Sequence, residues 1–171
     1  MNTNYETESD LYEKLVRSML ESGNSDEISN GKPEHAAVIF KLFFEFAVAK
    51  VLIFCKDLNS AVFDDDRILM AAKKAVRNGV SIRVIAQGEV QKNKFSEWLS
   101  EEANTGTCVS FKKSIGDSFP AKITANFAVM DEKAFRLEPN NKNIQAKACM
   151  NDPKGAKALA SIFQAMDLSL A

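Results

Sequence analysis

Side chains that could act as nucleophiles, bases or metal ligands are few in this chain and lie far apart. His35 is the only histidine, and no serine or cysteine is spaced from it in a way that indicates a catalytic partner. A single histidine also excludes the usual histidine-rich metal sites. His35 follows Pro33 and Glu34, a pair typical of a first helical turn. We therefore expect an exposed or capping histidine, not a catalytic one.

The other candidate ligands have structural explanations of their own. Cys55, Cys108 and Cys149 form no CxxC pair, which argues against a zinc site and predicts buried, reduced thiols. The run Asp64 to Asp66 could bind Mg²⁺ through its oxygen atoms, but acids at the start of a helix also stabilise the helix dipole. The sequence predicts no metal site and no cofactor.

Two lysine-rich segments, 92–95 and 111–113, each place a phenylalanine beside lysines. Such a pattern could follow a nucleic-acid backbone, and a solvated charged face gives the same pattern. The formal net charge of −1 and the pI of about 5.9 provide no overall attraction to nucleic acid or to an anionic membrane. Nucleic-acid binding stays open only as a local property.

The composition is that of a soluble globular protein. The chain has 171 residues, of which 46% are hydrophobic and 26% charged, enough apolar material for the core of one domain. The longest apolar run, 36–55, is interrupted by Lys41, Glu45 and Lys50, which argues against a membrane span. The N-terminal sequence is polar and acidic, unlike a signal peptide. We expect a cytoplasmic protein.

Hydrophobic periodicity and end signals divide the chain into alternating elements. Helices are predicted at 10–22, 33–49, 64–79, 90–103 and 152–170. Strands are predicted at 50–58, 80–88, 107–113, 121–131, 134–139 and 143–150. The glycine-, asparagine- and serine-rich segment 23–32 is predicted to be a flexible loop. We expect residues 1–31 to form a separable amphipathic helix with that loop, and residues 32–171 to form the main domain.

The order of these elements indicates the fold class. A strand, a helix and a second strand across 50–88 predict two parallel neighbours joined by a right-handed crossover. The later strands, beginning with a hairpin around residues 131–133, predict antiparallel pairing. We expect an α/β fold with one mixed, mostly parallel sheet between layers of helices.

This layout resembles one half of a phospholipase D-like fold. Three stretches carry the resemblance: "VLIFCKDLNSAVFDDDRILMAAKKAVRNGVSIRVIAQG", "ITANFAVMDEKAFRLE" and "ACMNDPKGAKALASIFQAM". Together they cover most of residues 34–166. Active members of that superfamily carry a strand motif of histidine, any residue and lysine, followed by four residues and an aspartate. The resemblance implies that two such motifs meet in one site, with histidine as nucleophile and lysine on the phosphate oxygens.

The resemblance places Thr124 at the histidine position, Asn126 at the lysine position and Asp131 at the aspartate position. A threonine without an adjacent base is a poor nucleophile, and asparagine has no positive charge to stabilise a developing anion. Asp131 also opens the hairpin, where an aspartate commonly forms hydrogen bonds within the turn. The glycine and serine that active members carry after the turn are missing from "RLEPNN", although Asn140 and Asn141 lie there.

Two classes of function follow. The first is a non-catalytic, phospholipase D-like interaction module of a bacterium, a pseudoenzyme that forms a homodimer or docks on a partner protein, because active single-motif relatives pair as two-fold dimers. The second is a phosphate-ligand or nucleic-acid binding domain, or a diverged phosphodiesterase or nuclease, that uses the same cleft. Its walls would include Thr124, Asn126, Asp131 and Lys122, with Asn140 and Asn141 as further ligand-binding candidates. A second chain could also supply the missing histidine and lysine.

Overall fold

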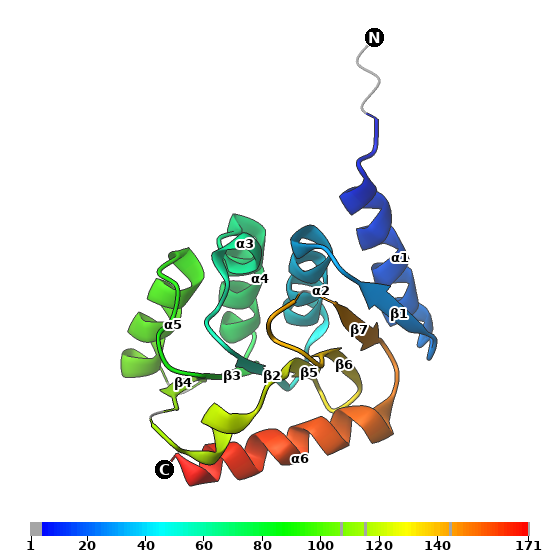
Figure 1. Ribbon diagram of the computed structural model, residues 1–171. Coiled ribbons are helices and arrows are strands. Elements are labelled where there is room, and N and C mark those ends of the chain that lie inside the picture. The colour runs from blue at the N-terminus through cyan, green and yellow to red at the C-terminus, as the bar shows by residue number, and fades with distance from the viewer. Residues whose placement is uncertain (1–4, 107, 115, 144, 171) are drawn as a thin grey trace.

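The protein folds around one seven-stranded mixed sheet with helices on both faces (Figure 1). This computed structural model describes residues 5–106, 108–114, 116–143 and 145–170. The strand order in the sheet is β1-β7-β6-β5-β2-β3-β4. β2, β3 and β4 are parallel neighbours, whereas β5, β6, β7 and β1 pair antiparallel. The parallel strands come from the early part of the chain, as the sequence predicts. The described sheet is mixed, but it has four antiparallel pairings and two parallel ones, so it is not mostly parallel, because the late strands add to one side of β2 as hairpins.

The described residues contain the following elements in chain order. The helices are α1 (Glu8–Ser22), α2 (Pro33–Phe46), α3 (Ser60–Phe63), α4 (Asp66–Arg77), α5 (Lys94–Thr105) and α6 (Pro153–Ser169), with the 3₁₀ helix η1 (Phe119–Lys122). The strands are β1 (Glu27–Asn30), β2 (Lys50–Cys55), β3 (Ser81–Ala86), β4 (Val109–Lys113), β5 (Asn126–Met130), β6 (Ala134–Glu138) and β7 (Ala146–Cys149). None of the described helices is both long and apolar enough to cross a membrane.

Two apolar layers fill the space between sheet and helices. Helix α6 covers one face, where η1 lies beside it, and the other α-helices lie on the opposite face (Figure 1). In β2, Leu52 and Phe54 point towards α6, whereas Val51 and Ile53 point towards the other layer. This alternation explains why the central strand is apolar at every position from Val51 to Cys55.

The N-terminal helix α1 begins with a reciprocal cap. The hydroxyl of Thr7 accepts from the amide of Asp10 at 3.1 Å, and the Asp10 carboxylate accepts from the Thr7 amide at 2.9 Å. The helix packs against α2 and buries Val16, Met19 and Leu20 in the core. It ends at Gly23, whose φ of 66° few other residues tolerate.

The prediction of a flexible loop over 23–32 is wrong at Glu27–Asn30, which form the edge strand β1 beside β7. The segment has no apolar alternation, and only Asn30 is buried, so its pairing partner, not its own pattern, makes it a strand. The division of the chain at residue 31 stays a prediction. Two other short elements, α3 and η1, were also not predicted.

Candidate functional site at one edge of the sheet

Polar residues gather where the parallel strands end. Because β2 and β3 are parallel and β5 runs antiparallel to β2, the residues that follow β2 and β3 lie beside the first residue of β5. These residues are Lys56, Gln87 and Asn126. In open α/β sheets the carboxyl ends of parallel strands are the usual place for a ligand.

Asn126 is held at both ends of its side chain. Its Oδ1 accepts from the backbone amide of Lys56 at 2.9 Å. Because a backbone N–H can only donate, the other end of the side chain must be the amide nitrogen. That nitrogen donates to Oε1 of Glu138 at 3.1 Å, across the β5–β6 ladder in which the two residues are direct partners.

Glu138 forms a buried ion pair with Arg136, two residues earlier on the same face of β6. The guanidinium donates to Oε2 of Glu138 at 3.1 Å and to Oδ1 of Asn30 at 3.2 Å. Only 3% of Arg136 and 7% of Glu138 is exposed. Burial lowers the pKa of Arg136, and the Glu138 carboxylate opposes that shift. The Arg136 guanidinium also lies 5.7 Å from the centre of the Phe40 ring.

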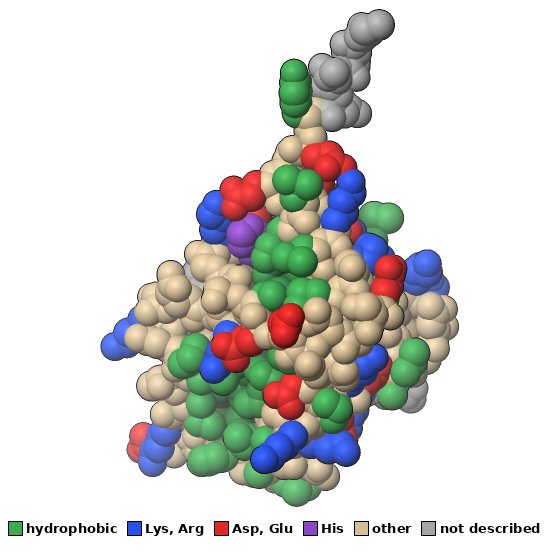
Figure 2. All heavy atoms as spheres, turned by 90° about the vertical axis from the view of Figure 1, so that its right-hand side faces the viewer, with side chains coloured by type: hydrophobic (Ala, Val, Ile, Leu, Met, Phe, Trp, Pro, Cys, Tyr) green, Lys and Arg blue, Asp and Glu red, His purple; other side chains and the backbone are tan. Residues whose placement is uncertain are grey.

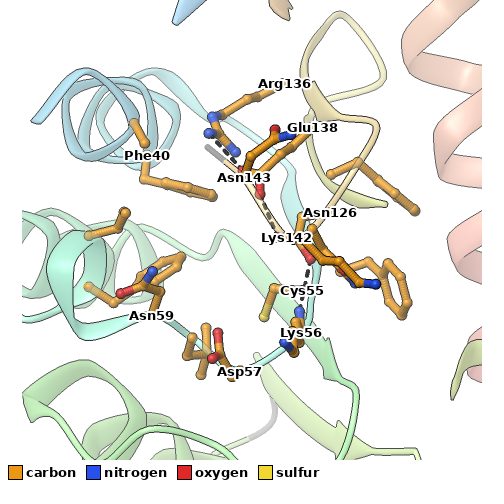
Figure 3. A pocket seen from close by; sticks show the side chains of 17 residues that line it. Phe40, Cys55, Lys56, Asp57, Asn59, Asn126, Arg136, Glu138, Lys142 and Asn143 are labelled. Atoms are coloured by element: carbon orange, nitrogen blue, oxygen red, sulfur yellow. Dashed lines mark hydrogen bonds and ion pairs between the residues drawn. The ribbon is translucent and has the colours of Figure 1, made fainter. Parts of the chain in front are cut away.

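These side chains form one wall of a cavity of about 360 Å³ between the sheet, α2 and α3. Figure 3 shows Asn126, Glu138 and Arg136 along one wall, with Phe40 and Asn59 opposite. Its described polar lining residues are Lys56, Asp57, Asn59, Asn126, Arg136, Glu138, Asn141, Lys142 and Asn143. Amides and paired charges therefore dominate the polar surface of this cavity.

The structure brings only part of the predicted set together. Asn126 and Asn141 line the cavity, whereas Thr124, Lys122 and Asn140 are not among its described lining residues and are exposed. The carbonyl of Thr124 accepts from the amide of Asn141 at 2.7 Å. Oδ1 of Asn140 accepts from the amide of Lys142 at 3.0 Å, within the loop itself.

Asp131 lies at the opposite edge of the sheet from Asn126. The two residues are five positions apart along the strand, a distance of roughly 16 Å. The Asp131 carboxylate accepts from the backbone amides of Val48 at 2.8 Å, Ala49 at 2.9 Å and Lys50 at 2.8 Å. The expectation that Asp131 lines the cleft is therefore wrong. Its carboxylate fixes the connection between α2 and β2 rather than the turn that it opens.

His35 packs against the N-terminal helix. Its ring stacks on Tyr12 with 4.0 Å between ring centres, and its Nε2 lies 3.4 Å from Oε1 of Glu8. Figure 2 shows this histidine at the surface, among acidic and basic side chains. In the part of the chain that the structure describes, no group of three or more histidine, cysteine, aspartate or glutamate side chains could hold a metal ion.

The two lysine-rich segments do not form a stacking surface. Phe95 is fully buried in the core. Three of the four lysines pair with carboxylates: Lys94 with Asp66 at 2.8 Å, Lys112 with Asp167 at 2.8 Å and Lys92 with Glu97 at 3.4 Å. Most lysines of these two segments are therefore ion-paired, which fits a solvated charged face better than a nucleic-acid-binding surface.

Sequence reasoning did not single out Gln87, Arg136 and Glu138. Gln87 donates to the carbonyl oxygens of Ile123 and Pro120, the latter at 2.7 Å, and accepts from Nδ2 of Asn141 at 3.1 Å. It therefore positions the segment before β5. A signal for the other two is present in "AFRLE", where two opposite charges at a spacing of two must share one face of a strand.

Comparison with solved structures places this arrangement of sheet and helices among known folds. A phospholipase D family member, Nuc from Salmonella typhimurium, superposes with a TM-score of 0.62 at 17% identity, covering 85% of this chain and 96% of that one. The chain has a phospholipase D-like fold. NucT from Helicobacter pylori gives a TM-score of 0.59 at 16% identity, covering 84% and 96% of the two chains.

A DNA-binding protein shares the fold as well. TrmBL2, described as an archaeal chromatin protein with a novel mode of DNA binding, superposes with a TM-score of 0.57 at 13% identity, covering 90% of this chain and 58% of that one. No protein-family model matches the sequence. No curated protein matches it either.

Proposed function

We propose that this protein is a non-catalytic, phospholipase D-like interaction module, in which Thr124 and Asn126 occupy the positions of the catalytic histidine and lysine. The observation that carries the proposal is the pairing of Asn126. Both polar ends of its side chain are used within the fold, by the Lys56 amide and by Glu138. The position that would hold a phosphate oxygen is part of an internal polar network.

The charges around Asn126 support the same conclusion. The neighbouring Glu138 carboxylate would repel the negative charge of a phosphodiester, and its own partner, Arg136, is buried. Thr124 needs a base to become a nucleophile. The only histidine packs on Tyr12 of the N-terminal helix. The residues that replace the catalytic pair therefore stabilise the fold without supplying phosphodiesterase chemistry.

An assembly role fits a fold that keeps its architecture after losing its chemistry. The module would act by self-association or by docking on a partner protein. Light scattering on the full-length chain separates these two forms of the proposal: a dimer supports self-association, and a monomer supports docking on a partner.

Hydrolysis of bis(p-nitrophenyl) phosphate and of a labelled single-stranded oligonucleotide tests the loss of catalysis. We expect no turnover above the buffer rate for the wild type, and the same background for Thr124→Ala. Turnover that Thr124→Ala or Asn126→Ala abolishes would overturn the proposal, because it would make these positions part of a working site.

A second candidate is binding of a phosphate ligand or nucleic acid at the same edge. The cavity beside Asn126 favours it, because Lys56 and Lys142 contribute to its lining. The DNA-binding TrmBL2 shares the fold. Fluorescence anisotropy with a labelled single-stranded oligonucleotide tests it. Binding that weakens with salt and is lost in Lys56→Ala/Lys142→Ala would favour this candidate, and the absence of binding would leave the interaction module.

A further inference from the structure

A second hollow lies between helices α2 and α4, away from the cavity beside Asn126. It has a volume of about 810 Å³ and is lined by residues from α1, α2 and α4 and by the two residues that follow α2 and α4. We call it the basic groove. Its described charged lining residues are Arg17, Lys41, Glu45, Arg67, Lys73, Lys74 and Arg77. Six cations and one carboxylate give this groove a strongly positive lining in a chain whose net charge is −1.

The two sides of the basic groove differ in how their charges are compensated. On the side of α1 and α2, Arg17 pairs with Glu45 at 2.8 Å and with Glu13 at 3.1 Å, and Lys41 pairs with Glu13 at 2.5 Å. This side is nearly neutral. The excess positive charge therefore comes from the side formed by α4.

The α4 side contains three cations without an ion pair. Arg67 pairs with Asp65 at 2.8 Å, whereas none of the ion pairs of the described residues includes Lys73, Lys74 or Arg77. Glu102 of α5 borders a neighbouring hollow that Lys73 and Arg77 also line. All three side chains are exposed. Lys74 and Arg77 lie in the last turn of α4, where cations also complement the helix dipole. Lys73 lies one residue before Lys74. Because all three side chains are exposed and without an ion pair among the described residues, they are available to a ligand.

The basic groove also has apolar surface. Met70 of α4 is 69% exposed and lines it together with Phe46 and Ala47 at the end of α2. Val48, the next residue along the chain, is 82% exposed. Methionine is common at peptide-binding surfaces because its flexible side chain adapts to different apolar groups.

We propose that the basic groove binds an acidic peptide segment of a partner protein, in which carboxylates flank an aliphatic or aromatic side chain. The carboxylates would pair with Lys73, Lys74 and Arg77, and the apolar side chain would contact Met70. This inference rests on the proposed interaction role and names its partner chemistry.

Two other occupants fit the basic groove less well. A single-stranded nucleic acid needs exposed aromatic faces for base stacking, but the Arg17 guanidinium already lies 5.6 Å from the centre of the Phe46 ring. A second copy docked groove to groove would place two positively charged linings against each other, which is electrostatically unfavourable. An acidic peptide satisfies both the charge and the apolar surface.

The test uses random 12-residue peptides displayed on phage, selected on the full-length protein and counter-selected on Lys73→Glu/Arg77→Glu. A fluorescein-labelled copy of an enriched peptide then gives Kd by fluorescence anisotropy. The matched control is Lys154→Glu/Lys157→Glu, the same charge change at exposed positions of α6 on the other face of the sheet. Circular dichroism and thermal melting verify that the variants fold.

We expect the selection to enrich Asp and Glu around a Leu, Ile, Phe or Trp. Binding should weaken about tenfold or more in Lys73→Glu/Arg77→Glu, weaken in Met70→Asp, change little in the control and fall as salt increases. No enrichment, enrichment of neutral or basic peptides, or equal binding to the groove variant would overturn the proposal.

Two further outcomes would also overturn it. Binding of a dT20 oligonucleotide that is lost in Lys73→Glu/Arg77→Glu would assign the basic groove to nucleic acid. A dimer in light scattering that dissociates in the same variant would assign it to a second copy. Phosphodiester hydrolysis would refute the non-catalytic role without affecting the peptide measurement, so failure of either proposal can be recognised separately.

Discussion

Asn126 and Glu138 face each other across the β5–β6 ladder, and the amide nitrogen of Asn126 donates to the Glu138 carboxylate at 3.1 Å. The pair lies where the resemblance to active phospholipase D-like enzymes places a phosphate-binding lysine. Because the carboxylate also binds the buried Arg136, it belongs to a network that extends to Asn30 in the edge strand. The side chain of Asn126 is therefore part of a hydrogen-bond network that crosses several strands of the sheet.

Replacing Asn126 by aspartate should destabilise the protein in a pH-dependent way. The change turns the donor that faces Glu138 into a second carboxylate, and like charges at hydrogen-bond distance raise the pKa of at least one of them. We expect a loss of about 1–3 kcal/mol in the free energy of unfolding at pH 7. The loss should shrink as the pH falls and one carboxyl group becomes protonated.

Urea unfolding at pH 7 and pH 5 measures this effect, with Asn126→Ala as the control. The alanine variant loses both hydrogen bonds of the Asn126 side chain but adds no charge, so its deficit should be similar at both pH values. An Asn126→Asp deficit that is unchanged by pH would contradict the proposed contact with Glu138.

Removing one member of the buried ion pair should lower the free energy of unfolding more than removing both members. Glu138→Leu leaves the guanidinium of Arg136, 3% exposed, without its carboxylate. We expect it to lower the free energy of unfolding by about 3–5 kcal/mol. Arg136→Met/Glu138→Leu removes both charges and should be clearly more stable than the single variant. Equal melting temperatures for the two variants would show that the charges do not stabilise each other.

Much of the fold could be predicted because local signals and tertiary structure agree. For α4, the acids of 64–66 at its start and the basic residues towards its end predicted a helix at 64–79, within two residues of its bounds in the structure, where Asp65 is the cap. The central strands β2 and β3 could also be predicted, because a strand that is buried on both faces has a nearly continuous apolar run. Among the strands the exception is β1, whose polar sequence becomes a strand only because β7 offers it an unpaired edge.

The candidate site could be predicted less well, since its residues come from strand ends that are distant in sequence. The spacing from Thr124 to Asp131 indicated one cluster, but a strand of that length carries its two ends to opposite edges of the sheet. Gln87 enters the site only because β3 is parallel to β2. Its hydrogen bonds to Pro120 and Asn141 depend on loop positions that no local pattern specifies.

Asp131 should matter for stability rather than for binding at the edge site. Asp131→Ala removes the acceptor of three backbone amides and places alanine at a φ of 51°. We expect a loss of about 2–4 kcal/mol in the free energy of unfolding. Asp131→Asn should fall between alanine and the wild type, because asparagine tolerates positive φ and keeps one oxygen acceptor. Chemical unfolding of the three proteins gives this order, and an alanine variant as stable as the wild type would refute it.

Glu13 should make the docking of α1 on α2 sensitive to acid. Burial alone would raise the pKa of Glu13, but the hydrogen bonds and charges of Lys41 and Arg17 outweigh burial and hold this pKa below its ordinary value of 4.5. A carboxylate whose pKa is lowered by folding stabilises the protein above its unfolded pKa, and this stabilisation is lost as the pH falls through the folded pKa. Glu13→Gln should therefore lower the free energy of unfolding by about 1 kcal/mol near pH 7, with the difference from wild type shrinking below about pH 4.5.

Urea unfolding at pH 7 and pH 3.5 measures this difference. Glu21→Gln, at an exposed position of the same helix, is the control for which no such change is expected. A Glu13→Gln deficit that stays constant across this range would show that the ion pairs with Lys41 and Arg17 do not contribute to folding.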